Sequence, residues 1–247
     1  MAHTGLALHL ESITKPRHTG LTASSFCREV VLHRIASRNT AAAFLNEMLN
    51  YGTILRHQHT ADKRKQMLSP SPGCLAAVCD WIALHLLTLD SLDGGQRSGL
   101  FQRMPLEATT LMQPVIAAAL LRDATIRQPG DAFSHFMWMN CGFVITERLI
   151  TAIEAAPAAG ANWTTALTSA APLSMGLNLS RSHFARKMSA AETLGVIGWG
   201  GTKGRSCLWL SGAFVRDYLE LQAAKLAIIE EAFDACIGQV SLRSVAV

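Results

Sequence analysis

Hydrophobic and polar positions repeat with a helical period over two separated stretches of the chain, residues 37–50 and 180–194. When successive residues are turned by about 100°, one side of the second helix collects Phe184, Met188, Ala191 and Leu194. Ser180 can cap the start of this helix, and Gly195 can end it in a left-handed conformation. The pattern therefore predicts an amphipathic helix whose outer face is polar and basic.

A strand, a turn and a return strand are predicted after each of these helices. Behind the second helix they occupy residues 196–210, with a glycine-rich basic turn at 200–205. Behind the first helix they occupy residues 53–68, and that helix is expected to turn inward Phe44, Met48 and Tyr51. The two stretches align if one residue is dropped in the turn. The same order of parts twice predicts an internal repeat.

The remaining pattern is helical, with two linkers. Helices are predicted over residues 22–34, 74–89, 105–121, 133–156, 162–170 and 213–233, and no element is assigned to residues 1–20. Linkers at residues 93–99 and 155–160 divide the chain into residues 1–93, 94–160 and 161–247. We expect a mainly α fold with small β-hairpin wings: two winged helix-turn-helix units joined by a helical middle, which serves as connector, dimer contact or effector region.

A family resemblance lies in residues 61–71, ADKRKQMLSPS. An acidic residue, a run of bases, an apolar strand, a Ser-Pro pair and a long helix follow one another there, and this order resembles the wing of MarR-like winged-helix regulators. The resemblance implies that Asp62 braces the tip and that Arg64 reaches into a minor groove. It also implies a signal-responsive regulator, and two units in one chain would form a built-in pseudo-dimer. The second unit departs from the pattern, with no acid before Lys203-Gly204-Arg205 and with Gly212 in place of a proline.

Small polar residues and arginines on an outward face suit a helix that enters a major groove about 12 Å wide. The second helix is the more basic, so we expect it to read bases while the basic tip of the first unit contacts phosphate. The expected DNA-binding residues are Ser37, Arg38, Asn39, Lys63, Arg64, Lys65, Ser180, Arg181, Ser182, His183, Arg186, Lys187, Lys203 and Arg205. It stays equally open that the first helix serves packing alone.

An aromatic and methionine cluster lies in the predicted connector. Methionine and aromatic side chains adapt to irregular apolar ligands. Candidates for the lining of a small-molecule effector cavity are Phe136, Trp138, Met139 and Phe143. More often such a cluster is the core where two halves meet, or the seam of a dimer.

Composition places the chain among globular proteins and gives no reason to propose an enzyme. It is 49% hydrophobic and 16% charged, with a net charge of +4 that permits an anionic partner. Six cysteines are scattered without metal-ligand spacing and no secretion signal precedes them, so we expect reduced thiols in the cytoplasm. The GxGxxG, GxxxxGKS/T, HExxH and GxSxG signatures are absent. We expect no metal, no cofactor and no membrane segment.

The predicted function is that of a cytoplasmic DNA-binding transcriptional regulator. Its expected partners are double-stranded DNA, a small-molecule effector and a second copy in a homodimer. One alternative is a winged-helix interaction or scaffold module without DNA binding, which the modest net charge allows. Another is an all-α enzyme built on a central cavity, which a buried polar constellation would support.

Overall fold

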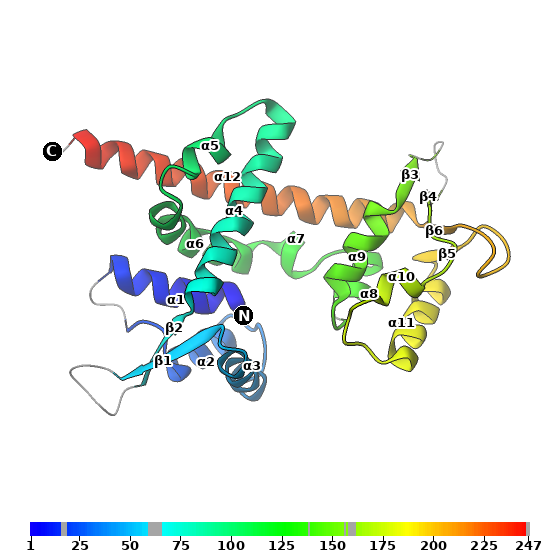
Figure 1. The fold of residues 1–247 in the computed structure, drawn as a ribbon, viewed down its shortest axis with the longest axis horizontal. Helices are drawn as coiled ribbons and strands as arrows, with labels where there is room; N and C mark the ends of the chain where they lie inside the picture. Colours follow the sequence, from blue (N-terminus) through cyan, green and yellow to red (C-terminus); the bar gives the residue numbers. More distant parts are fainter. Residues whose placement is uncertain (16–18, 59–65, 138, 156, 158–161, 246–247) are drawn as a thin grey trace. The chain divides into compact units, whose positions relative to one another are not determined.

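The fold is mainly helical and contains two small antiparallel sheets, as the sequence predicts (Figure 1). The computed structural model describes residues 1–247 except 16–18, 59–65, 138, 156, 158–161 and 246–247. Contacts divide the chain into two compact units, one of residues 1–123 with 225–247 and one of residues 124–224. This division differs from the expected segments, since it places 94–123 in the first unit and 124–160 in the second.

The first unit consists of helices and one hairpin. Its elements are α1 (Ala2–Thr14), α2 (Ala23–Leu32), α3 (Arg38–Asn50), β1 (Ile54–Gln58), β2 (Gln66–Pro70), α4 (Pro72–Asp93), α5 (Arg97–Phe101), α6 (Pro105–Arg122) and the later part of α12 (Gly212–Val245). Helices α2 and α3 and the hairpin share a core that includes Phe26, Val30, Ala41, Leu45 and Leu68. This core fixes which face of α3 is turned to solvent.

Helix α1 is an element that the sequence pattern does not predict. Leu6, Leu8 and Leu10 alternate as in a strand, yet all three are buried. They are buried because α1 packs along α6 and also contacts α2 and strand β2. A helix with neighbours on several sides buries residues outside a single amphipathic face.

The second unit is built around a four-stranded antiparallel sheet in the order β3-β4-β6-β5. Its elements are α7 (Ala124–Arg127), α8 (Asp131–Met137), α9 (Gly142–Thr151), β3 (Ile153–Ala155), β4 (Trp163–Thr165), α10 (Ala171–Ser174), α11 (Arg181–Thr193), β5 (Ile197–Trp199), β6 (Leu208–Leu210) and the first part of α12. The core side chains include Phe133, Phe136, Ile145, Leu210 and Phe214, all fully buried. Helix α11 packs against this core and contacts β5.

The expected single helix over residues 133–156 is wrong. Helix α8 ends before Gly142, α9 begins there, and residues 153–155 form strand β3. Gly142 lies so close to Phe136 that a Cβ on the glycine would overlap the Phe136 carbonyl oxygen. Cys141, just before it, has a positive φ of 57°. This tight turn breaks the apolar run that the sequence pattern presents as continuous.

The expected helix over residues 162–170 is also wrong. Residues 163–165 form β4, which pairs with β3 on one side and with β6 on the other. Thr165 Oγ1 also donates a hydrogen bond to the Leu208 carbonyl oxygen (2.8 Å). Tryptophan and threonine favour strands, and two-sided pairing stabilises this one. Most of the expected linker at 155–160 lies outside the described residues.

The two predicted reading helices end in the same way. Gly52 after α3 and Gly195 after α11 have positive φ values of 66° and 67°, which confirms the left-handed end predicted for Gly195. The N–H of each glycine and the next N–H bond back to the last turn, as in a Schellman motif. The bonds run from Gly52 to Leu49, Thr53 to Met48, Gly195 to Glu192 and Val196 to Ala191. The connection from helix to hairpin therefore has the same local backbone geometry in both places.

Hydrogen bonds of the two hairpins also correspond. Each return strand donates a backbone hydrogen bond to a segment earlier in the chain, from Leu68 N to Leu21 O (2.9 Å) and from Leu208 N to Leu167 O (2.7 Å). The serine before the next helix donates to the residue just before the first strand, from Ser71 N to Thr53 O and from Ser211 N to Val196 O (both 2.9 Å). Both serine hydroxyls also accept an N–H of the following helix. Gly195 lies 143 positions after Gly52 and Ser211 lies 140 after Ser71, so three residues are dropped in the second turn, not one. The same pattern of backbone hydrogen bonds therefore recurs around both hairpins.

A polar group is buried between α1, α4 and α6 in the first unit. Gln113 Nε2 donates to His3 Nδ1 (2.8 Å), and the His3 ring centre lies 5.1 Å from that of Trp81. Burial lowers the pKa of His3 from 6.5 to about 4. His3 is therefore neutral in the folded protein at neutral pH.

The free energy of unfolding is expected to decrease as the pH falls from 6.5 towards 4, because His3 gains a proton more readily in the unfolded chain. The contribution of His3 is roughly 2–3 kcal/mol at neutral pH and is lost across that window. Urea unfolding of His3→Gln should depend less on pH than that of the wild type, with His57→Gln at an exposed site on β1 as the control. An unchanged pH dependence in His3→Gln would contradict this account.

Candidate nucleic-acid interface

Helix α11 presents two exposed arginines around its buried stripe. That stripe consists of Phe184, Met188 and Ala191. Because these positions face the core, the helical period turns Arg186 to the opposite side, whereas Arg181 lies in the first turn on the flank of the stripe, and both side chains are exposed. Ser180 Oγ accepts the His183 N–H (3.3 Å), which confirms the predicted cap.

The expected contact residues of the second unit differ in exposure and in their partners. Exposed residues are Ser180, Arg181, Ser182, Arg186, Lys203 and Arg205, and half-buried ones are His183 and Lys187. Arg186 Nη2 donates to His183 Nδ1 (3.2 Å), and Lys203 Nζ donates to Glu192 Oε1 (2.6 Å). None of the described residues forms a salt bridge with Arg181 or Arg205. Among the described residues Arg181, Arg186 and Arg205 therefore need lose no ion pair to meet an anion, whereas Lys203 would have to leave Glu192.

The β5–β6 hairpin holds its basic turn close to the end of α11. In its register Gly198 faces Trp209, and a Cβ on Gly198 would overlap the Trp209 indole ring. A glycine at this position thus lets the indole lie across the neighbouring strand. Gly204 in the turn has a positive φ of 80°, a conformation that side chains disfavour.

Helix α3 presents a polar but nearly uncharged outer face. Ser37 Oγ accepts the Thr40 N–H (3.1 Å), so this serine caps α3 as Ser180 caps α11. Arg38 and Asn39 are exposed, and Glu47 is exposed on the same helix. The three expected contacts at the tip of this unit, Lys63, Arg64 and Lys65, lie outside the described residues.

Two residues expected on the inner stripes are at the surface. Tyr51 is 71% exposed and Leu194 is 63% exposed. Each is the C-cap of its helix, directly before the left-handed glycine. The chain leaves the helical path there, so the helical period no longer decides which way a side chain points.

Exposed polar residues absent from the expected set lie on the first unit. Asn46 and Asn50 are exposed on α3, and Arg56 is exposed on β1. The sequence alone indicates this asparagine face, because positions 39, 46 and 50 share one face of a helix. Asparagine amides pair with adenine in the major groove, so this face has base-reading chemistry without net charge.

The predicted effector residues do not converge on one cavity. Phe136 and Met139 are buried in the core of the second unit, where the Phe136 ring meets that of Phe214 edge to face. Phe143 is 44% exposed. Trp138 lies outside the described residues. The described members of the cluster thus act mainly in packing.

An apolar cleft of about 140 Å³ lies in the first unit instead. It is closed by α1, α2, α3, the hairpin and α4, and its walls include Leu6, Leu21, Phe26, Phe44, Met48 and Ile54. No charged side chain lines it. Apolar cavities of about 150 Å³ take up a single aromatic ring, so the cleft matches a small apolar molecule in size and lining.

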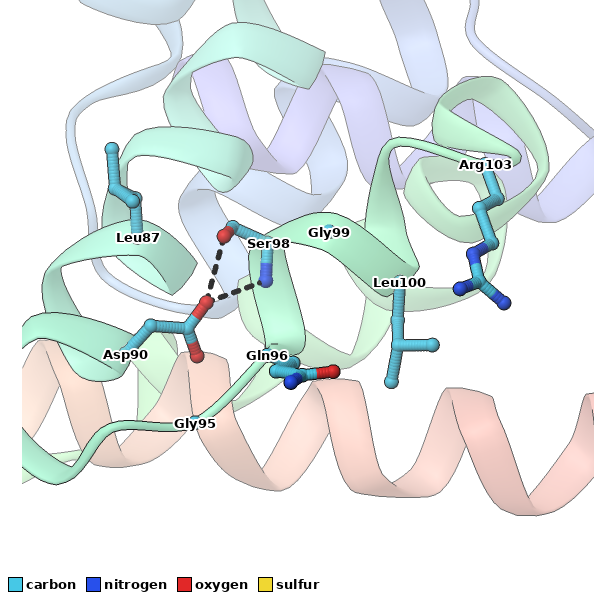
Figure 2. Close-up of a pocket in the computed structure, with 8 residues that line it drawn as sticks. All are labelled: Leu87, Asp90, Gly95, Gln96, Ser98, Gly99, Leu100 and Arg103. Carbon is cyan, nitrogen blue, oxygen red and sulfur yellow. Dashed lines mark hydrogen bonds between the residues drawn. The ribbon is translucent and has the colours of Figure 1, made fainter.

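A second cleft, of about 340 Å³, opens where α4 meets α5 (Figure 2). Asp90 points to the start of α5, where Ser98 donates to its Oδ2 through both N (2.9 Å) and Oγ (2.7 Å). Arg97 donates to Asp90 Oδ1 as well. These bonds lower the pKa of Asp90 despite its desolvation, which acts in the opposite sense. The carboxylate is satisfied within the protein, so it holds α5 on α4 and leaves no free ligand group.

Among the described residues, no group of three or more His, Cys, Asp or Glu side chains could hold a metal ion. One helix, α4, has the length and composition of a membrane-spanning segment, with a mean hydropathy of 1.5. Core helices of soluble proteins can have the same composition, so this property alone does not assign α4 to a membrane. Leu84 and Leu87 of α4 are exposed.

No protein-family description, no curated protein and no solved structure matches this chain. The resemblance to MarR-like wings therefore rests on residues 61–71, of which 61–65 lie outside the described part. The geometry of α11 and its hairpin is the firmer basis for a functional argument.

Replacing Gly198 with alanine is expected to destabilise the second unit by about 1–3 kcal/mol, because the new methyl group overlaps Trp209. Gly200→Ala is the matched control, since its Cβ meets only the Cys207 carbonyl oxygen at 3.7 Å. Urea midpoints of both variants and the wild type would measure the difference. Equal midpoints for the two variants would show that the hairpin can shift away from the indole.

Proposed function

We propose that this protein is a DNA-binding transcriptional regulator in which α11 reads base sequence and the β5–β6 hairpin contacts the DNA beside it. One observation carries the proposal: Arg181 and Arg186 are exposed on a helix that buries one stripe in the core, directly before a hairpin with a basic turn. A helix about 10–12 Å across with its side chains fits a major groove about 12 Å wide. Arginine forms paired hydrogen bonds with guanine there.

In this proposal, α3–β1–β2–α4 and α11–β5–β6–α12 are two winged-helix units. The shared Schellman ends, strand bonds and serine caps support it, because dissimilar side chains produce the same local geometry twice. Strands β3 and β4 extend the sheet of the second unit only. The pairing of β4 with β6 supports the hairpin from the side away from β5.

The first unit has the secondary role in this proposal. Its helix would approach DNA with Arg38 and Asn39, capped by Ser37, and its tip would contact phosphate with Lys63, Arg64 and Lys65. Phosphate contacts position a protein without reading sequence. The net charge of α3 is low because Glu47 offsets Arg38, which agrees with a secondary role for this helix in DNA binding.

The apolar cleft of the first unit supports a small apolar effector. Phe44 and Met48 of α3 and Ile54 of β1 form part of its wall. A bound molecule would therefore contact both the helix and the hairpin proposed to meet DNA. We therefore propose that an effector binds in the first unit and not at Phe136 and Met139, because these two side chains are already packed in a core.

A protein-interaction role for the first unit is the second candidate, and one observation favours it. Leu84, Leu87 and Leu92 of α4 are 61%, 53% and 73% exposed. An exposed run of leucines on one helix is typical of a protein contact. The DNA measurements below separate the two candidates, because a purely protein-binding chain would be insensitive to changes on α11.

The double variant Arg181→Ala/Arg186→Ala is expected to weaken binding to a sequence selected from random DNA by about 2–5 kcal/mol, because each arginine that pairs with a base contributes about 1–3 kcal/mol. Binding to unrelated sequence should fall much less. Fluorescence anisotropy with both duplexes measures the two affinities. Arg216→Ala, an exposed arginine on α12, is the control. Unchanged affinity in the double variant would exclude α11 as the reading helix.

Arg205→Ala is expected to weaken binding to all duplexes alike and to make the slope of log K against log salt shallower by about 0.9, the value for one phosphate contact. Arg205 lies in the turn and is exposed, with no salt bridge to a described residue. Affinities at several salt concentrations give the slope. A change confined to the selected sequence would instead assign Arg205 to base contact.

A further inference from the structure

Glu192 in the last turn of α11 ties the hairpin turn to the helix. Its Oε1 accepts Lys203 Nζ from the turn (2.6 Å) and Trp199 Nε1 from the end of β5 (3.2 Å). Lys203 Nζ also lies 6.0 Å from the centre of the Trp199 ring. One carboxylate thus connects the proposed reading helix, a strand and a cation of the proposed phosphate contact.

The position of this carboxylate is electrostatically unfavourable without its partner. The last turn of a helix carries the negative end of the helix dipole, where an anion is destabilising. No basic residue of α11 lies in that turn. Lys203 supplies the missing positive charge from the hairpin. The bond from Trp199 does not need a charged acceptor, because a neutral glutamine could accept that N–H equally well. The negative charge of Glu192 therefore matters for its bond with Lys203.

The repeat gives an internal comparison. Gly52 of the first unit matches Gly195, and by the same offset Leu49 stands where the second unit has Glu192 and Arg56 stands where it has Trp199. The shared fold therefore does not need this carboxylate. It is a feature of the unit that carries the more basic helix.

We propose that Glu192 competes with DNA phosphate for Lys203 and so lowers the sequence-independent part of DNA binding by the second unit. This inference rests on the proposed function. A carboxylate oxygen and a phosphate oxygen are equivalent acceptors for an ammonium group. While Glu192 binds Lys203, the two charges cancel, so a DNA phosphate near the turn is not attracted by a free cation there. Discrimination is then left to Arg181 and Arg186, which have no carboxylate partner among the described residues.

Glu192→Gln tests this directly, since it keeps a hydrogen-bond acceptor for Trp199 and frees one cation. On a duplex of arbitrary sequence, the slope of log K against log salt should steepen by about 0.9, with binding about tenfold tighter at 50 mM salt and about threefold tighter at 200 mM. The ratio of affinities for a selected and an arbitrary duplex should fall. The control is Glu154→Gln, an exposed glutamate on β3 with the same change in charge.

The double variant Glu192→Gln/Lys203→Gln isolates the pair. It should return the affinity and the salt slope to near wild-type values, because the freed cation is gone. Circular dichroism and urea midpoints establish that each variant is folded.

Three outcomes overturn the inference while leaving the proposed function in place. They are an unchanged slope in Glu192→Gln, an equal gain in Glu154→Gln, and a gain that persists without Lys203, each in a protein whose binding still depends on Arg181 and Arg186. A wild-type protein that binds no duplex at any salt concentration overturns the proposed function together with the inference. The two failures are therefore distinguishable.

Discussion

The burial of one stripe on α11 is the constraint on which the rest of the account depends. Phe184, Met188 and Ala191 lie in the core of the second unit, and a rigid helical period then decides what every other position of the helix faces. That period turns Arg186 to solvent, and Arg181 is exposed on the flank of the stripe in the first turn. A loss of the apolar stripe would therefore remove both the packing of the helix and the placement of its cations.

The same local rules act twice in the chain, with different consequences. Matched glycines end both helices, and matched serines begin the helices after both hairpins. The surfaces built on this common geometry differ, since α3 carries asparagines and a balanced Arg38 and Glu47, whereas α11 carries arginines. Glu192 adds a further difference by engaging Lys203 in the second unit only. The two halves thus share a local backbone geometry and differ in the charge of the surface that it carries.

Local signals in the sequence predict a large part of this structure, and long-range contacts account for most of the errors. The period of α11, its serine cap and Gly195 all act within a few residues, and each is confirmed. Strand β4 depends on pairing with β6, more than 40 positions later, so no local pattern could indicate it. The break at Gly142 depends on a close approach to Phe136 that composition does not show. Lys203 could be recognised as a cation from the sequence, but its partner Glu192 lies 11 positions away and required the hairpin to be built.

Photo-cross-linking from the outer face of α11 tests the central claim most directly. A benzophenone amino acid placed at Ser182, between the two arginines that we propose to read bases, should form cross-links to the bases of a bound duplex. The same group at Leu219 on α12, which is 54% exposed, should give few or none. Equal yields from the two positions, or no cross-link from Ser182 to DNA that the protein demonstrably binds, would contradict the assignment of α11 as the element that enters the groove.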